Sequence, residues 1–311
     1  MTPPALGSLS GYPETQALVR DVLDVWPDHE DYLARSMGAR SDGQMATTEE
    51  VAAATRRLIA GRGRHFAEAY KWTCDQLRQE ELFFHREGRY RLATFAEADA
   101  EVYSRPEYME PYVSGLLLTQ ALWYNHLGTF DMFLDRVLRP TREPFDYLEI
   151  GPGHGLAVFF AAKHPHARSV AAWDVSATSL AETRKALDTL GVSTPVDLTE
   201  VDILSAAEPA QRYDLIVISE VLEHLEQPET AVRFLRKALK PGGRLFVNVP
   251  INSPSPDHIY LFSTPDEVSA LVEAAGLTIE VRELYATQAR PIEKAIKNRI
   301  SVSVGLTARA A

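Results

Sequence analysis

The pattern of hydrophobic and polar positions divides the chain into two parts near residue 140. In the first part, apolar side chains recur every three to four residues, a spacing typical of amphipathic helices. One helix is predicted over Arg64–Glu87 and ends at Gly88, because a glycine commonly terminates a helix. Thr47 and Glu50 have the spacing of a capping box and predict another helix start.

The last helix of this part is predicted over Leu116–Leu138, a long apolar stretch with helical spacing. We expect a bend near Gly128, and Pro140 ends the helix because proline lacks the backbone N–H that a helix needs. Together these segments predict an all-helical domain over residues 1–140.

From Pro144 onward the pattern changes to short apolar strands that alternate with helices. The predicted strands are Tyr147–Ile150, Ser169–Trp173, Val196–Glu200, Asp214–Ile218, Arg244–Val249, Thr278–Leu284 and Ser301–Leu306. The predicted helices are Leu156–Lys163, Ala177–Leu190, Pro228–Leu239 and Pro265–Ala275. This alternation predicts an α/β domain over residues 141–311, with a mostly parallel sheet and helices on both faces. The last two strands have no helical pattern between them, so an antiparallel pair with a long connection is open to them.

Charge and composition narrow the class of partner. The chain has 45% hydrophobic and 24% charged residues and a formal net charge of −11. Residues 1–140 carry 15 basic and 21 acidic side chains, and residues 141–311 carry 17 and 22, so neither part is basic. A protein that binds nucleic acid needs a basic surface for the phosphates. We therefore expect a small-molecule substrate and no nucleic-acid partner.

Cys74 is the one cysteine, so the chain has no internal disulfide and suits a reducing compartment. The segment Met1–Ser10 lacks the basic and apolar regions of a signal peptide. No apolar run approaches the roughly 20 residues of a membrane span. We expect a cytoplasmic protein without a membrane partner. No cluster of histidines and carboxylates calls for a metal ion, and the sequence leaves a homodimer open.

The most informative segment runs from Tyr147 to Gly155 and reads as a buried strand, a glycine-rich turn and a helix start. Gly151 and Gly153 begin a G-x-G-x-G pattern, which differs from the G-x-G-x-x-G of a dinucleotide pocket. Glu149 lies two positions before the first glycine, where a carboxylate would repel a pyrophosphate and suit a ligand with positive charge.

Two acidic residues follow the next two predicted strands. Asp174 ends the second strand, 23 positions after Gly151, where a carboxylate accepts hydrogen bonds from ribose hydroxyls. The alternative for Asp174 is to cap the helix that begins near Ser176. Asp202 follows the third strand and is placed to accept from the exocyclic amine of adenine, with a plain turn residue as the alternative.

With two further segments the chain resembles the class I S-adenosylmethionine-dependent methyltransferases over about residues 141–311. Ser219–Leu225 is similar to the fourth-strand motif of the small-molecule branch, which includes quinone-biosynthesis enzymes, and Leu239–Gly243 to the turn before the fifth strand. The resemblance implies a Rossmann-like seven-stranded sheet with an antiparallel last strand, and S-adenosyl-L-methionine as cofactor with S-adenosyl-L-homocysteine as product. The residues expected to bind the cofactor are Glu149, Gly151, Gly153, Gly155, Asp174, Val175, Asp202, Ile203, Ser219 and Asn125.

Candidate catalytic residues lie beyond the fourth and fifth strands and in the helical domain. Glu220 follows the fourth strand, where the methyl group is expected to point, and suits a general base or a substrate contact. His258 and Tyr260 follow the fifth strand, and Tyr124 is an aromatic candidate near the sulfonium. His224 is a natural base by chemistry, but it belongs to the family motif and is expected to be architectural.

These features predict methyl transfer to a small-molecule acceptor, in specialised metabolism, with the helical domain as a lid that sets specificity. Three alternatives stay open. S-adenosylmethionine's own aminobutyryl chain can cyclise to azetidine-2-carboxylate with release of methylthioadenosine. A binding protein can keep the cofactor pocket without turnover. Nicotinamide-dependent oxidoreduction is disfavoured by the glycine spacing and by Glu149.

Overall fold

The computed structural model describes residues 6–206, 208–209 and 211–310, and they form two compact units. Unit 1 comprises Met1–Asp131, Asn252–Leu261 and Tyr285–Ser303, and unit 2 comprises Met132–Ile251, Phe262–Leu284 and Val304–Ala311. Unit 1 therefore contains two late segments that the sequence prediction assigned to the α/β domain. Among the helices described, none combines the length and the apolar character that crossing a bilayer requires.

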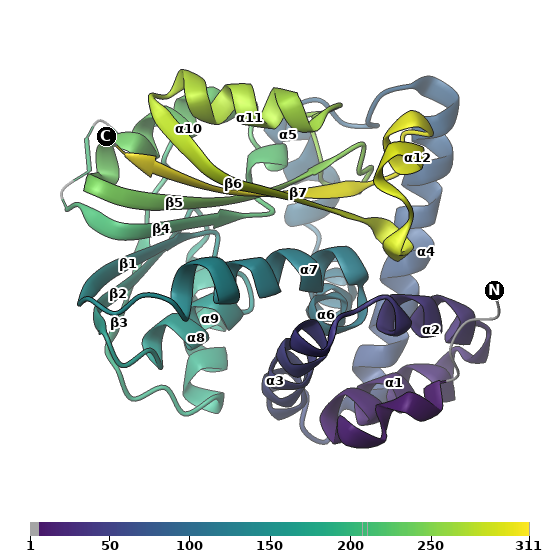
Figure 1. Ribbon diagram of the computed structural model, residues 1–311. Helices are drawn as coiled ribbons and strands as arrows, with labels where there is room; N and C mark the ends of the chain where they lie inside the picture. The colour runs from purple at the N-terminus through teal and green to yellow at the C-terminus, as the bar shows by residue number, and fades with distance from the viewer. Residues whose placement is uncertain (1–5, 207, 210, 311) are drawn as a thin grey trace. The chain divides into compact units, whose positions relative to one another are not determined.

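Unit 1 is built mainly of helices, as the apolar spacing predicts (Figure 1). Its N-terminal elements are η1 (Leu6–Gly11), α1 (Pro13–Val25), η2 (Pro27–His29), α2 (Glu30–Gly38), α3 (Asp42–Leu58), α4 (Gly63–Glu87), α5 (Phe95–Ala98), η3 (Asp99–Tyr103), α6 (Pro106–Leu122) and α7 (Tyr124–Met132). Its late elements are η6 (Thr287–Ala289) and α12 (Ile292–Lys297). The prediction for α4 is confirmed, and Gly88 ends the helix with a left-handed φ of +75°.

The predicted start of α3 is wrong. The helix begins at Asp42, and its capping box is formed by Ser41 and Gln44. Thr47 lies inside the helix, where its hydroxyl donates to Asp131 Oδ1 at 2.5 Å. Both pairs have capping-box spacing, so local sequence alone does not distinguish them.

The single helix predicted over Leu116–Leu138 is also wrong, because the chain breaks at Trp123 and not near Gly128. Trp123 has extended backbone angles (φ −89°, ψ 135°) and separates α6 from α7. Its indole Nε1 donates to the hydroxyl of Tyr70 at 2.9 Å. A second irregularity follows, since η4 (Phe133–Leu138) is a π-helix.

Side chains from α2 and from the short connection between α2 and α3 stabilise this break. Arg40 Nη1 donates to the carbonyl of Ala121 at 2.8 Å, and Ser36 Oγ donates to the carbonyl of Leu122 at 2.7 Å. These carbonyls end α6 and would otherwise lack partners inside the helix. The break thus depends on residues more than 80 positions away in the sequence.

Unit 2 contains the seven-stranded sheet, with helices on both faces (Figure 1). Its strands are β1 (Phe145–Ile150), β2 (Ala167–Asp174), β3 (Val196–Glu200), β4 (Tyr213–Ser219), β5 (Leu239–Ile251), β6 (Leu277–Ala286) and β7 (Val302–Ala310). Its helices are α8 (Leu156–Ala162), α9 (Ala177–Thr189), η5 (Leu222–His224), α10 (Pro228–Ala238) and α11 (Pro265–Ala274). The strand order is β3-β2-β1-β4-β5-β7-β6, and the pairs among β1 to β5 are parallel. All seven predicted strands are confirmed, with ends that differ by a few residues.

The last strand runs against its neighbours. Thr287 N donates to Ser301 O at 3.0 Å, which joins the end of β6 to the start of β7. At the other end of this pair Arg309 Nε donates to Glu280 at 2.6 Å, and Arg309 also donates to Gly242 O near the start of β5. The predicted antiparallel pairing of β7 is therefore confirmed, although the connection contains the short helix α12.

The amino ends of β1, β2 and β5 meet in a charged cluster around Asp146. Arg168 Nε donates to its carboxylate at 2.8 Å, Ser169 Oγ at 2.7 Å and Lys240 Nζ at 2.5 Å. The hydrogen bonds from Arg168 and the other donors hold the pKa of Asp146 well below its usual value. This cluster lies at the edge of the sheet formed by the amino ends of the strands. In such folds ligands bind at the opposite edge, beyond the carboxyl ends.

Replacing Asp146 with alanine is expected to lower the free energy of unfolding by about 2–3 kcal/mol, because charged donors lose a buried acceptor. The pKa of Asp146 is lower in the folded protein than its ordinary value of 3.8. The stabilisation by Asp146 is therefore fully present above pH 3.8 and is lost as the pH falls toward the folded-state pKa. Urea unfolding at pH 7 measures the effect. Lys237→Ala, which removes an exposed pair with Glu208, is the control and should cost below about 1 kcal/mol. Equal losses in the two variants would contradict the structural role of the cluster.

Candidate functional site

The glycine loop follows β1 at the carboxyl edge of the sheet. Gly151, Gly153 and Gly155 all have left-handed backbones, with φ of +66°, +49° and +70°. A Cβ on Gly151 would lie 2.6 Å from Val221 Cγ2, whereas a Cβ on Gly153 would meet no atom within 4 Å. Thr183 Oγ1, from α9, donates to Gly153 O at 2.7 Å and holds the loop. The loop is therefore tightly packed at its first glycine and open at its second.

Glu149 is turned into the protein just before this loop. Its Oε2 accepts from the hydroxyl of Tyr147 at 2.9 Å, and the backbone N–H of Val158 in α8 also donates to it. Burial raises the pKa of the carboxyl to about 8, so it is mostly protonated at neutral pH. The side chain thus joins β1 to α8 through these two hydrogen bonds.

Asp174 ends β2 and is held at both carboxylate oxygens. Oδ1 accepts from Ser176 N at 2.9 Å, and Oδ2 accepts from Ser179 Oγ at 2.7 Å. Ser176, not Asp174, is the N-cap of α9. Each carboxylate oxygen can accept a further hydrogen bond, so Asp174 can take a ribose diol without losing these contacts. Val175 beside it is 55% exposed and offers an apolar surface.

The two candidate residues after β3 differ in their exposure to solvent. Asp202 is exposed, and its Oδ1 accepts from Leu204 N at 2.9 Å in a turn. Ile203 is buried. Because its side chain is exposed, Asp202 is accessible to a ligand from solvent.

Glu220 directly follows β4 and has a strained backbone, with φ of +54°. A left-handed backbone at a residue other than glycine costs energy and persists where surrounding contacts hold it, often at functional sites. Asn248 in β5 provides these contacts. Its carbonyl accepts from Glu220 N at 3.0 Å, and its Nδ2 donates to Glu220 Oε1 at 2.9 Å and to Ser219 Oγ at 3.0 Å.

Asn248 is the partner that the sequence prediction missed. It is 3% exposed, and its Oδ1 is buried without a hydrogen-bond donor. A polar residue within the apolar run Leu245–Val249 was the available signal. Burial raises the pKa of Glu220 to about 7, while the hydrogen bond from Asn248 opposes the rise. The Glu220 carboxyl can therefore gain or lose a proton near neutral pH, as a general base must.

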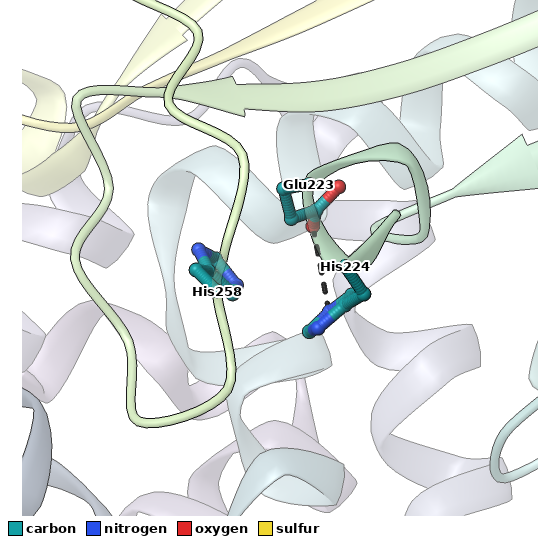
Figure 2. Close-up of side chains that lie close together, drawn as sticks. All are labelled: Glu223, His224 and His258. Carbon is teal, nitrogen blue, oxygen red and sulfur yellow. Dashed lines mark ion pairs between the residues drawn. The ribbon is translucent and has the colours of Figure 1, made fainter. Parts of the chain in front are cut away.

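Figure 2 shows the pair that follows, in which His224 Nε2 lies 3.9 Å from Glu223 Oε1. The two residues belong to η5, and Glu223 is fully buried. Because η5 spans only Leu222–His224, Glu220 and His224 do not share a helix face.

The other candidate residues belong to unit 1. Asn125, in the first turn of α7, is 2% exposed, and its Nδ2 donates to Ser303 Oγ at 3.1 Å. Tyr124 is half-buried, with its ring centroid 6.3 Å from that of Tyr285. The structure thus separates the candidates into a set in unit 2 that ends at Glu220 and a set in unit 1.

His258 and Tyr260 lie on the segment Asn252–Leu261 of unit 1, and Figure 2 labels His258. His258 is buried, and one ring nitrogen lies 2.6 Å from Ser253 O. Tyr260 is half-buried. Because this histidine is already hydrogen-bonded to the backbone, its orientation is set within the segment.

A buried network that the sequence prediction missed holds this segment. The Tyr112 hydroxyl donates to Asp257 Oδ1 at 2.7 Å and lies 2.6 Å from Ser255 Oγ. Ser255 Oγ also donates to Asp257 at 3.0 Å. Since Tyr112 belongs to α6, the network explains why a segment that follows β5 packs with the helices of unit 1.

The arrangement in unit 2 is characteristic of a nucleoside-binding domain, and a comparison with known families decides its type. Residues 148–245 match the family model of a methyltransferase domain. The match covers less than half of the chain and identifies residues 148–245 as a methyltransferase domain. S-adenosyl-L-methionine is the cofactor of this family, as the resemblance in the sequence implies.

Curated relatives of the methyltransferase domain include two ubiquinone biosynthesis O-methyltransferases. The protein from Azoarcus sp. is 32% identical over 99 residues, which cover 32% of this chain and 41% of the relative. The protein from Marinobacter nauticus is 32% identical over 110 residues, which cover 29% of this chain and 45% of the relative. The chain thus spans less than half the length of the curated relatives it matches.

Solved structures similar to this chain include the N-methyltransferase NodS from Bradyrhizobium japonicum in complex with S-adenosyl-L-homocysteine. It is 19% identical with a TM-score of 0.47, over 70% of this chain and 97% of NodS. The [4+2]-cyclase SpnF is 21% identical with a TM-score of 0.46, over 57% of this chain and 78% of SpnF.

The residues of the methyltransferase domain fit this cofactor. The backbone at Gly153 faces space that a side chain would otherwise fill, and Asp174 and Asp202 have accepting capacity for a nucleoside. The exposed Val175 provides an apolar surface for a purine.

Proposed function

We propose that this protein transfers the methyl group of S-adenosylmethionine to a small-molecule acceptor in specialised metabolism. The observation that carries the proposal is Glu220, a carboxyl with a pKa near 7 on a strained backbone next to the glycine loop of a methyltransferase domain. Gly151 approaches Val221, the residue after Glu220, so the loop and the carboxyl belong to one edge of the sheet.

When bound, S-adenosylmethionine would supply an electrophilic methyl group for the acceptor atom. Glu220 takes the proton that the acceptor loses, and Asn248 orients the carboxyl for that step. Asp174, Val175, Asp202 and Ile203 bind the nucleoside, and Ser219 lies at the end of β4, beside β1. Positioning and exclusion of water are the protein's main contributions to such a displacement.

Unit 1 is proposed to act as the lid and the specificity region, through Tyr124, Asn125, His258 and Tyr260. A small acceptor is supported by the acidic chain, with its net charge of −11, which disfavours polyanionic substrates. The similarity of the methyltransferase domain to ubiquinone biosynthesis O-methyltransferases also supports a small acceptor.

The test is to incubate the purified protein with S-adenosylmethionine, alone and with a panel of small phenols, amines and carboxylic acids. We expect S-adenosylhomocysteine to form only when an acceptor is present, as measured by chromatography and mass spectrometry. Release of methylthioadenosine without any acceptor would contradict methyl transfer and favour the intramolecular cyclisation. Cofactor binding without turnover on any acceptor would favour a binding protein.

A further inference from the structure

Unit 1 contains a buried arginine just before α3. Arg40 is 9% exposed. It is the single buried arginine or lysine within the part of the chain that the structure describes. Burying a cation costs several kcal/mol unless an anion compensates its charge. The partners of Arg40 therefore decide whether the residue is structural or functional.

The partners that Arg40 has in the described part of the chain are neutral. Nη1 donates to Thr48 Oγ1 at 2.7 Å and to Ala121 O at 2.8 Å, and Nη2 donates to Ser36 Oγ at 3.1 Å. Nε is buried and has no acceptor. A guanidinium has five N–H donors, so one on Nη2 and the one on Nε are unused.

The electrostatic surroundings do not supply the missing negative charge. The groups that interact with the Arg40 guanidinium over longer range are the phenols of Tyr32 and Tyr124, and burial lowers the pKa of Arg40 to about 9. The carboxyl end of α6 contributes a partial negative charge at Ala121. However, α7 begins two residues after α6 ends, at Tyr124, and its amino end contributes a partial positive charge.

We propose that Arg40 is the anchor of a carboxylate-binding site in unit 1. The unused donors are on Nε and Nη2, the two adjacent nitrogens that bind both oxygens of a carboxylate side by side. The contacts of Nη1 to Thr48 and Ala121 hold the guanidinium plane, so the free edge is fixed before a ligand binds.

A second unpaired polar atom lies at the same helix junction. Asn125 Oδ1, in the first turn of α7, is buried and accepts no hydrogen bond, while its Nδ2 is held by Ser303. An N–H donor suits this oxygen, as a carboxylate suits Arg40. An α-amino acid group presents both, and S-adenosylmethionine carries one at its methionyl end. The other source of a carboxylate for Arg40 is the acceptor molecule. Only this second assignment rests on the proposed function.

The experiment measures binding and needs no turnover, so a failure of methyl transfer leaves it interpretable. In the first arm, calorimetry compares S-adenosylhomocysteine with its decarboxylated analogue on the wild-type protein and on Arg40→Gln. If the cofactor is the source, the wild type binds S-adenosylhomocysteine about tenfold or more tightly than the analogue, and Arg40→Gln loses this preference.

In the second arm, acetate and benzoate are titrated into protein saturated with S-adenosylhomocysteine, at constant ionic strength. If the acceptor is the source, the wild type binds benzoate saturably and Arg40→Gln does not. The proposal is overturned if the wild type shows neither the cofactor preference nor benzoate binding. It is also overturned if either property persists unchanged in Arg40→Gln.

Because Arg40 also stabilises the end of α6, two further variants separate folding from binding. Ser36→Ala removes the hydroxyl that donates to the Leu122 carbonyl and accepts from Arg40 Nη2, but it keeps the guanidinium and both contacts of Nη1, so the carboxylate preference should persist. Arg40→Lys keeps a positive charge but lacks the paired donors, and it should lose most of the preference. It replaces Arg40→Gln as the deciding variant if circular dichroism shows that Arg40→Gln is unfolded. A preference that is lost equally in Ser36→Ala and Arg40→Lys would assign Arg40 a structural role and overturn the proposal.

Discussion

Replacing Gly151 with alanine is expected to abolish measurable cofactor binding. The backbone φ of +66° costs a residue with a Cβ about 1–2 kcal/mol, and the new Cβ would lie 2.6 Å from Val221 Cγ2. Relief of that overlap moves either the loop or the segment that begins at Glu220. Because both form the proposed site, we expect no heat of S-adenosylhomocysteine binding by calorimetry up to millimolar ligand.

The matched control is Gly242→Ala. Gly242 has a similar φ of +71°, and a Cβ there would meet no atom within 4 Å. This variant carries the backbone strain without the overlap, so it should lose about 1 kcal/mol of stability and keep its affinity for S-adenosylhomocysteine. Equal affinities of Gly151→Ala and Gly242→Ala for S-adenosylhomocysteine would contradict the prediction that an overlap with Val221 disrupts the site.

Replacing Glu220 with glutamine is expected to lower kcat by about 100-fold or more, because the isosteric amide cannot accept the proton. Affinity for S-adenosylhomocysteine should change little, which separates a role in chemistry from a role in folding. The measurement is initial rate against acceptor concentration, with the acceptor that the panel identifies. The control is Glu226→Gln, which changes an exposed glutamate between η5 and α10. This variant should keep the wild-type rate.

The pH profile gives a second readout of Glu220. Burial raises its pKa to about 7, and the carboxylate is the form that accepts a proton. The rate should therefore be low at pH 5, rise through about pH 7 and level off above it. Glu220→Gln should lose this rise. A wild-type rate that is flat between pH 5 and 8 would contradict the role of Glu220 as the base.

Local features of the sequence were sufficient for the α/β part of the molecule. The seven strands and the helices α8 to α11 were predicted because short apolar runs and helical periodicity mark them in the sequence, whereas α12 was missed. The glycine loop was recognisable for a similar reason, since the left-handed angles at Gly151, Gly153 and Gly155 favour glycine wherever the loop occurs. The cofactor was implied by the family resemblance that these motifs and the acidic residues after β2 and β3 carry.

The sequence thus determined the order of the elements, the glycine loop and the class of cofactor, because each of these is encoded by neighbouring residues. Only the tertiary structure decided which polar groups meet. The break at Trp123 depends on Ser36 and Arg40, and the position of the Glu220 carboxyl depends on Asn248 in the next strand. Asp257 and Tyr112 likewise join a segment after β5 to a helix of unit 1. Hydrophobic periodicity reports burial along one element and carries no information on such partners, which are separated by 28 to 145 residues in the chain.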